Sequence, residues 1–165
     1  KELDLIKLVN HTSRPPRVGE SDGLHYHFIT KDEFKKSIGN NEMLEYEIMS
    51  ASGHYYGTEK SNLDNLLITH NVICDKMPIG ALNLKKHFGN QAVTIFVDAN
   101  NSELSHRLLD KSRVHEQDLM KKRLEQADAE RQYKPKFDYQ ITNTDGKLNE
   151  AVVKATKIIL DKITA

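Results

Sequence analysis

The sequence predicts an α/β protein in which short parallel strands alternate with helices. Residues 72–74 and 93–97 are short apolar runs without polar alternation, a pattern typical of strands that are buried on both faces. Between these runs, Pro78 stands where a proline suits the first turn of a helix. Strand, helix and strand in this order form the βαβ unit of an α/β fold.

Local patterns predict the elements that precede this unit. Residues 3–9 and 25–29 are apolar enough for two short strands. Thr30 and Glu33 have the spacing of a capping box, which predicts that a helix begins there and continues through Ile38. Residues 43–49 alternate as a half-buried strand does, and the leucines within residues 63–67 indicate a short helix.

The second half of the chain is predicted to be mainly helical. Residues 102–111 and 117–133 are charged helices, and residues 137–142 form a strand between them and the C-terminus. The last helix carries a single apolar stripe. Its members are Leu148, Val152, Ala155, Ile159 and Ile163.

Composition limits the class of protein. A chain of 165 residues is about one domain. Its 24 basic and 24 acidic residues give a net charge of zero, which excludes a general nucleic-acid binder with a basic surface. No run of about 18 apolar residues predicts a membrane span, and the single Cys74 excludes an internal disulfide and a multi-cysteine zinc site. We therefore expect a cytoplasmic protein without nucleic-acid or membrane partners.

A basic loop is the densest group of residues that could bind a ligand. Arg14 and Arg17 stand three residues apart beside Pro15 and Pro16, which stiffen the loop. Two guanidinium groups held in this way suit bidentate capture of a phosphate or carboxylate. The spacing alone also fits a solvated basic turn.

Other candidate residues can be explained either by an ordinary structural role or by a function. Glu45 lies in an apolar strand, where its carboxylate could face solvent or a planar ligand with two N–H donors. Tyr55 and Tyr56 could be ordinary strand packing. His25 and His27 could bind a metal, but no third ligand is evident in the sequence.

Three stretches of sequence together resemble the GMP-binding half of the guanylate kinases. Residues 11–28 read His-Thr-Ser-Arg-Pro-Pro-Arg-Val-Gly-Glu-Ser-Asp-Gly-Leu-His-Tyr-His-Phe. Residues 41–46 read Asn-Glu-Met-Leu-Glu-Tyr, and residues 53–58 read Gly-His-Tyr-Tyr-Gly-Thr. Weaker resemblance continues through residues 75–81, a lid helix that carries arginines, and residues 141–143.

The resemblance implies a fold and a domain plan. The fold would be a P-loop-kinase-like parallel sheet with flanking helices, a small mixed-β GMP-binding subdomain and a helical lid. Residues 1–165 would form one guanylate-kinase-like domain, with residues 10–58 as the GMP-binding region and residues 105–130 as the lid region. No Gly-x-x-x-x-Gly-Lys-Ser/Thr motif occurs in the chain. We therefore expect a P-loop unit to precede Lys1.

The resemblance also assigns roles to residues of this chain. Arg14, Arg17, Tyr26 and Tyr56 would hold the GMP phosphate, and the base would contact Asn10, Glu45 and Thr58. Asp75 would also belong to the GMP site, at a position where the family makes guanine or magnesium contacts. The lid arginines that neutralise the transferred phosphoryl group would be drawn from Arg107, Arg113 and Arg123, and Asn143 would stand on the adenine side of ATP. Met77 replaces the second acid that family members usually carry two residues after Asp75.

The implied activity is phosphorylation of GMP or dGMP by ATP to give GDP and ADP, with Mg²⁺ bridging the ATP phosphates. This is a nucleotide-binding transferase of purine metabolism, acting as a monomer or homodimer. A non-catalytic guanylate-kinase-like module that binds a phosphopeptide or GMP is the alternative. The presence of Glu45, the loop arginines and the lid arginines favours the enzyme.

Overall fold

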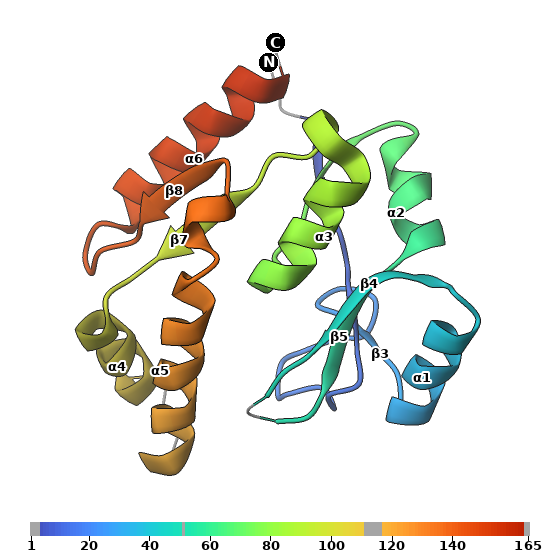
Figure 1. Cartoon of the computed structure of the whole chain (residues 1–165), viewed down its shortest axis with the longest axis horizontal. Coiled ribbons are helices and arrows are strands. Elements are labelled where there is room, and N and C mark those ends of the chain that lie inside the picture. Colours follow the sequence, from blue (N-terminus) through green and yellow to red (C-terminus); the bar gives the residue numbers. More distant parts are fainter. Residues whose placement is uncertain (1–3, 51, 111–116, 164–165) are drawn as a thin grey trace. The chain divides into compact units, whose positions relative to one another are not determined.

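The computed structural model describes residues 4–50, 52–110 and 117–163 (Figure 1). The chain divides into two compact units, Lys1–Leu84 and Lys85–Ala165. Both units are α/β, and each contains a pair of parallel strands. The α/β fold with parallel strands that the sequence predicts is therefore confirmed. None of the helices in the described part of the chain has the length and apolar character needed to cross a bilayer.

A four-stranded mixed sheet dominates the first unit, with strand order β3-β2-β5-β4. The two central strands, β2 (His11–Thr12) and β5 (Tyr55–Glu59), are antiparallel. On the outer sides, β3 (His27–Phe28) runs parallel to β2, and β4 (Met43–Ile48) runs antiparallel to β5. Figure 1 shows β4 and β5 as the long pair of this sheet, with α1 beside them. This arrangement is the small mixed-β part expected from the sequence.

The remaining elements of the first unit are two strands and three helices. Strands β1 (Leu5–Lys7) and β6 (Asn71–Ile73) pair in parallel. The helices are α1 (Lys31–Gly39), α2 (Lys60–Leu67) and the larger part of α3 (Pro78–Phe88), whose last residues belong to the second unit. Helix α1 has the predicted capping box, in which Thr30 Oγ1 accepts from the Glu33 amide at 3.2 Å and the Glu33 carboxylate accepts from the Thr30 amide at 2.7 Å. Pro78 is the first residue of α3, as predicted.

The two faces of the β4–β5 pair differ in chemistry. On one face the buried Phe34 of α1 packs against Tyr46 and Tyr55, with ring centroids 6.5 and 5.2 Å away. Gly57 permits this packing, because a Cβ there would lie 2.7 Å from the Glu45 carbonyl oxygen and 3.0 Å from the Phe34 ring. The opposite face carries polar side chains. They are Glu45 and Glu47 of β4 and their cross-strand partners Thr58 and Tyr56 of β5.

The second unit is built on the parallel pair of β7 (Ile95–Asp98) and β8 (Tyr139–Thr142). Helices α4 (Asn101–Asp110) and α5 (Gln117–Arg131) follow β7 and pack against each other (Figure 1). Helix α6 (Leu148–Ile163) ends the unit and packs against β8. Two short 3-10 turns complete it, Gly89–Gln91 and Lys134–Lys136.

Two predictions about burial are wrong. The strands predicted to be buried on both faces are not, because Ile73 is 42% exposed and Val97 is 59% exposed. Within the described residues β6 and β7 each pair with one neighbour only, so each lies at the edge of a two-stranded sheet. The predicted stripe of α6 is also misplaced, since Leu148 is 60% exposed while Ala151 is buried. Val152 and Ile163 of the stripe are exposed as well, while Ala155 and Ile159 are half-buried.

Candidate functional site

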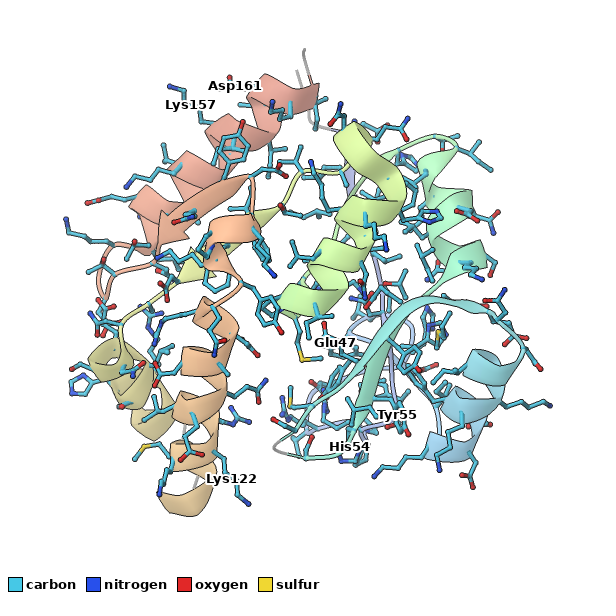
Figure 2. The ribbon with its side chains drawn as sticks, viewed as in Figure 1. Glu47, His54, Tyr55, Lys122, Lys157 and Asp161 are labelled. Atoms are coloured by element: carbon cyan, nitrogen blue, oxygen red, sulfur yellow. The ribbon has the colours of Figure 1, made fainter. Side chains whose placement is uncertain are left out.

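Hydrogen bonds from the sheet fix the loop that carries the two arginines. Thr12 Oγ1 donates to the Tyr55 carbonyl oxygen at 3.0 Å and accepts from the Arg14 amide at 3.2 Å. Ser13 Oγ accepts from the Tyr55 amide at 2.9 Å. Both hydroxyl residues are buried, and Figure 2 labels Tyr55 and its neighbour His54 at the start of β5. Arg14 therefore leaves the sheet from a defined position.

Arg14 is buried and paired with a carboxylate that sequence reasoning did not identify. Its Nη1 donates to Glu20 Oε2 at 2.7 Å and its Nη2 to Glu20 Oε1 at 3.0 Å. These bonds, together with one from the Arg17 amide, lower the pKa of Glu20 from 4.5 to about 2. The Arg14 Nε is buried and has no hydrogen-bond partner within the described residues. One edge of this guanidinium group is thus left for a further acceptor.

Two tyrosines surround the same guanidinium group. Arg14 lies 5.4 Å from the centroid of the Tyr26 ring, and the Tyr26 and Tyr56 rings meet edge to face at 5.9 Å. The hydrogen bond with Glu20, and after it one with Tyr56, raises the pKa of Arg14. We call Arg14, Tyr26 and Tyr56 the arginine–tyrosine cluster. The side chain of Arg17 is exposed beside it.

A second polar group, the Glu45 cluster, consists of Asn10, Glu45, Thr58 and Lys76. Glu45 is only 6% exposed, so it faces inward and not toward solvent. Thr58 Oγ1 donates to Glu45 Oε1 at 2.7 Å and lies 3.2 Å from Asn10 Oδ1. Lys76 Nζ donates to Glu45 Oε1 at 2.7 Å, to Asn10 Oδ1 at 2.5 Å and to the Thr58 hydroxyl. Three of the residues predicted to contact the base are therefore in one hydrogen-bonded network.

Lys76 is the member of this cluster that the sequence analysis missed. Its side chain is 8% exposed, which is rare for a lysine unless it is paired. It follows the carboxyl end of the parallel strand β6, the edge at which α/β sheets bind their ligands. This position after β6 could have marked Lys76 as a candidate site residue in the sequence. Asp75 was named instead, because it matches the pattern of the family.

The start of α3 is tied to the same sheet face. The Gly80 amide donates to Glu47 Oε1, and a Cβ on Gly80 would lie 2.5 Å from Glu45 Oε2. Figure 2 labels Glu47 on β4, close to the beginning of α3. The absence of a side chain at Gly80 therefore lets both carboxylates approach the first turn of this helix.

Asp75 is not part of the Glu45 network through its carboxylate. That group is 65% exposed and lies 3.7 Å from Lys7 Nζ. Only its backbone participates, since the Asp75 carbonyl oxygen accepts from Asn10 Nδ2 at 3.3 Å. Burial, and after it the negative charge of Asp75, raises the pKa of Tyr26.

The predicted lid residues differ in their surroundings. Arg107 of α4 donates from Nε to Asp145 Oδ1 at 2.8 Å and from Nη2 to the Asn143 carbonyl oxygen at 2.6 Å. It therefore contacts the loop that carries the predicted adenine-side residue. Arg123 of α5 is half-buried and forms no hydrogen bond or ion pair with any described residue. Arg113 lies outside the described residues.

Arg131, which the sequence analysis did not single out, holds the end of α5 to β7. Its Nε donates to Asp98 Oδ1 at 2.9 Å, and its Nη1 donates to Asn101 Oδ1 at 2.7 Å. Lys134 Nζ donates to the other Asp98 oxygen at 2.8 Å. Burial opposes ionisation of Asp98, but these hydrogen bonds outweigh it and lower the pKa of Asp98. This network is structural support for the helices that carry the predicted lid arginines.

The remaining candidates do not form a separate site. His25 accepts from the Ser21 amide at 3.0 Å, whereas His27 stacks on His11 with ring centroids 4.7 Å apart. Burial, and after it the charge of His27, lowers the pKa of His11. No three His, Cys, Asp or Glu side chains come close enough to hold a metal within the residues described. Burial raises the pKa of Cys74, in agreement with an unreactive thiol.

Comparison with known proteins identifies the family. The family model described as guanylate kinase matches residues 3–162. The chain is 35% identical over 161 residues to the guanylate kinase of Bacteroides fragilis, covering 96% of this chain and 77% of that protein. It is 37% identical over 152 residues to the guanylate kinase of Chlorobaculum tepidum, covering 91% and 76%.

A solved structure agrees in fold. The crystal structure of guanylate kinase from Anaplasma phagocytophilum superposes with a TM-score of 0.73 at 20% identity, covering 96% of this chain and 76% of that one. The family model and the relatives at more than one-third identity together show that this chain belongs to the guanylate kinase family.

Proposed function

We propose that this protein transfers the γ-phosphoryl group of ATP to GMP or dGMP, giving ADP and GDP or dGDP. The observation that carries the proposal is the placement of two clusters along one strand. Tyr56 and Thr58 are two residues apart on β5, so their side chains point to the same face. Tyr56 belongs to the arginine–tyrosine cluster and Thr58 to the Glu45 cluster. A guanidinium group with two phenol hydroxyls and a carboxylate are therefore carried by one face of the same strand, as the two ends of a nucleoside monophosphate require.

The arginine–tyrosine cluster would hold the phosphate. The buried Nε of Arg14 lacks an acceptor within the described residues, and a dianionic phosphate supplies one. The Tyr26 and Tyr56 hydroxyls are donors of the same cluster, and Arg17 stands beside it with an exposed side chain. Because the phosphate of GMP is already ionised at neutral pH, the reaction needs positioning and charge stabilisation and no general base.

The Glu45 cluster would bind the base. The carboxylate of Glu45 is an acceptor for the N1–H and N2–H₂ donors of guanine, an edge that adenine does not offer. Thr58 orients this carboxylate through its hydrogen bond to Glu45 Oε1, and Asn10 Oδ1 lies 3.2 Å from the same Thr58 hydroxyl. Asp75, whose carboxylate is exposed, is proposed as a residue of the GMP site on the resemblance alone.

The second unit would supply the ATP side. Arg123 is proposed, on the resemblance, to contact the transferred phosphoryl group. Arg107 holds the loop of Asn143 and would position that residue toward adenine. Arg113 is proposed as a further lid arginine on the resemblance alone. We also propose that the protein acts in the cytoplasm, as a monomer or homodimer.

Magnesium would accompany ATP. The described residues contain no cluster of three metal-ligating side chains. We propose, on the family resemblance, a Mg²⁺ ion that is carried mainly by the substrate phosphates, as is usual for phosphoryl-transfer enzymes. When bound, the ion neutralises the charge of the ATP phosphates.

A calorimetric titration and a coupled assay of ADP release test the proposal. Because the chain contains no P-loop motif, GMP binding and turnover are measured separately. We expect GMP to bind at least about tenfold more tightly than AMP, the effect of one lost hydrogen bond. Equal binding of the two nucleotides would overturn the GMP assignment. GMP binding without ADP release in the native protein would favour the non-catalytic module.

A further inference from the structure

We propose that Lys76 is a specificity-determining residue that donates a hydrogen bond to the 6-oxo group of the purine base. The inference rests on the proposed function and names a contact of the same site. It starts from the finding that a buried ammonium group lies 2.7 Å from the carboxylate oxygen of Glu45.

Glu45 and Lys76 together present hydrogen-bond acceptors next to hydrogen-bond donors. Glu45 Oε1 accepts from Thr58 and Lys76, while Glu45 Oε2 has no hydrogen bond within the described residues. A carboxylate has about four acceptor sites and an ammonium group has three donors. Acceptors from Glu45 and donors from Lys76 therefore stand next to each other on one buried surface.

The edge of guanine carries donors next to an acceptor, which is the complement of the acceptors of Glu45 next to the donors of Lys76. The N1–H and N2–H₂ groups are donors, and O6 beside them is an acceptor. When the two donors meet Glu45, the adjoining acceptor needs a donor, and Lys76 is the cation hydrogen-bonded to that carboxylate. Adenine places an amino group at position 6, so Lys76 would face a donor. Lys76 would thus add to the discrimination that Glu45 provides.

Lys76 can give up its hydrogen bond to Glu45 without leaving a buried polar atom unsatisfied. Its three acceptors are Glu45 Oε1, Asn10 Oδ1 and Thr58 Oγ1. Glu45 Oε1 keeps the bond from Thr58 at 2.7 Å, so turning one N–H of Lys76 toward a ligand leaves that oxygen satisfied. The other reading is that Lys76 only balances the charge of Glu45. The two readings differ in whether the loss of Lys76 depends on the ligand's atom at position 6.

The experiment compares GMP with 6-thio-GMP, in which sulfur, a weak acceptor, replaces O6. Dissociation constants are measured by calorimetry for the unaltered chain, Lys76→Met, Lys76→Gln and a surface control, Lys35→Met, whose side chain is 59% exposed. We expect the unaltered chain and the control to prefer GMP by about ten- to hundredfold. Lys76→Met should bring the preference close to one, and Lys76→Gln, a neutral N–H donor, should keep part of it.

Each contrary outcome has a separate meaning. If Lys76→Met weakens both ligands by the same factor, Lys76 is only the counter-ion of Glu45 and the inference is wrong. If the unaltered chain binds both ligands equally, the inference is wrong whether or not the variants fold. If the unaltered chain binds AMP as well as GMP, the proposed function itself fails. Circular dichroism confirms which variants are folded.

Discussion

Glu45 and Thr58 face each other across β4 and β5, and the Thr58 hydroxyl donates to the Glu45 carboxylate at 2.7 Å. The carboxylate proposed to read guanine is therefore oriented before any ligand binds. Pre-orientation of this kind reduces the entropy lost on binding.

Replacing Glu45 by Gln should weaken GMP binding about ten- to hundredfold, since an unmatched buried group costs about 1–3 kcal/mol. The variant also leaves Lys76 without its anion, and breaking a buried pair costs about 3–5 kcal/mol of folding free energy. Calorimetry measures the first effect and chemical denaturation the second. Asp32→Asn, at a side chain that is 97% exposed, is the control. Unchanged GMP affinity in a folded Glu45→Gln variant would remove Glu45 from the site.

Replacing Gly57 by Ala should destabilise the first unit by about 1–3 kcal/mol, the usual cost of overpacking. The added methyl group would meet the backbone of β4 at 2.7 Å and the Phe34 ring at 3.0 Å. Gly39→Ala at the end of α1 is the matched control, because a Cβ there meets nothing within 4 Å. It should stabilise slightly or have no effect. Equal unfolding midpoints in urea for both variants would contradict the packing described here.

The Arg14–Glu20 pair predicts a loss of stability in acid. The pKa of Glu20 is about 2 in the folded chain against an ordinary 4.5, so its ionised form is bound more tightly in the folded state. Its contribution is fully present above pH 4.5 and is lost as the pH falls toward 2.

Other carboxylates also titrate in this range, so the test compares the free energy of unfolding of the unaltered chain with that of a variant that lacks only the Glu20 carboxylate. The free energy of unfolding of the unaltered chain minus that of Glu20→Gln should be constant between pH 5.5 and 7 and shrink below pH 4.5. A difference that does not change with pH would show that the Arg14–Glu20 pair does not hold in solution.

Replacing Arg123 by Ala should lower kcat by about 10³-fold or more, as expected for an arginine that contacts the transferred phosphoryl group. GMP affinity should change little, because the interaction is made mainly in the transition state. Arg131→Ala is the informative comparison. It breaks the contacts with Asp98 and Asn101 and should reduce thermal stability. If Arg123→Ala instead abolishes GMP binding with kcat retained, Arg123 belongs to the GMP site.

The sequence predicted those parts of the fold that local chemistry determines. The capping box of Thr30 and Glu33 and the first-turn position of Pro78 depend on neighbouring residues alone, and the structure has both. Periodicity also predicted most of the other strands and helices, but not β2 (His11–Thr12), which lies at the centre of the mixed sheet. The loop of Arg14 could also be located, because its prolines and arginines are adjacent in the chain.

The parts that could not be predicted depend on contacts between distant residues. Lys76 and Glu45 are 31 residues apart, and the turn between β6 and α3 decides that Lys76, and not Asp75, points toward Glu45. The buried face of α6 depends on how the helix packs within the second unit, where Ala151 is buried and Leu148 is exposed. Glu20 was passed over because a carboxylate beside arginines gave no separate signal. Glu20 matters because both of its carboxylate oxygens accept hydrogen bonds from Arg14, which only the structure shows.

Because Tyr56 and Thr58 are two residues apart on β5, the strand sets the distance between the phosphate and the base that a ligand must have. One full pleat of a strand spans about 6.6–6.8 Å, and this length is a property of the backbone that side-chain replacement does not alter. A compound with a longer or shorter spacer between phosphate and base would satisfy one cluster at the expense of the other. Selection by length should therefore persist in variants whose base preference has been changed, and inserting or deleting one residue within Tyr55–Glu59 should abolish it.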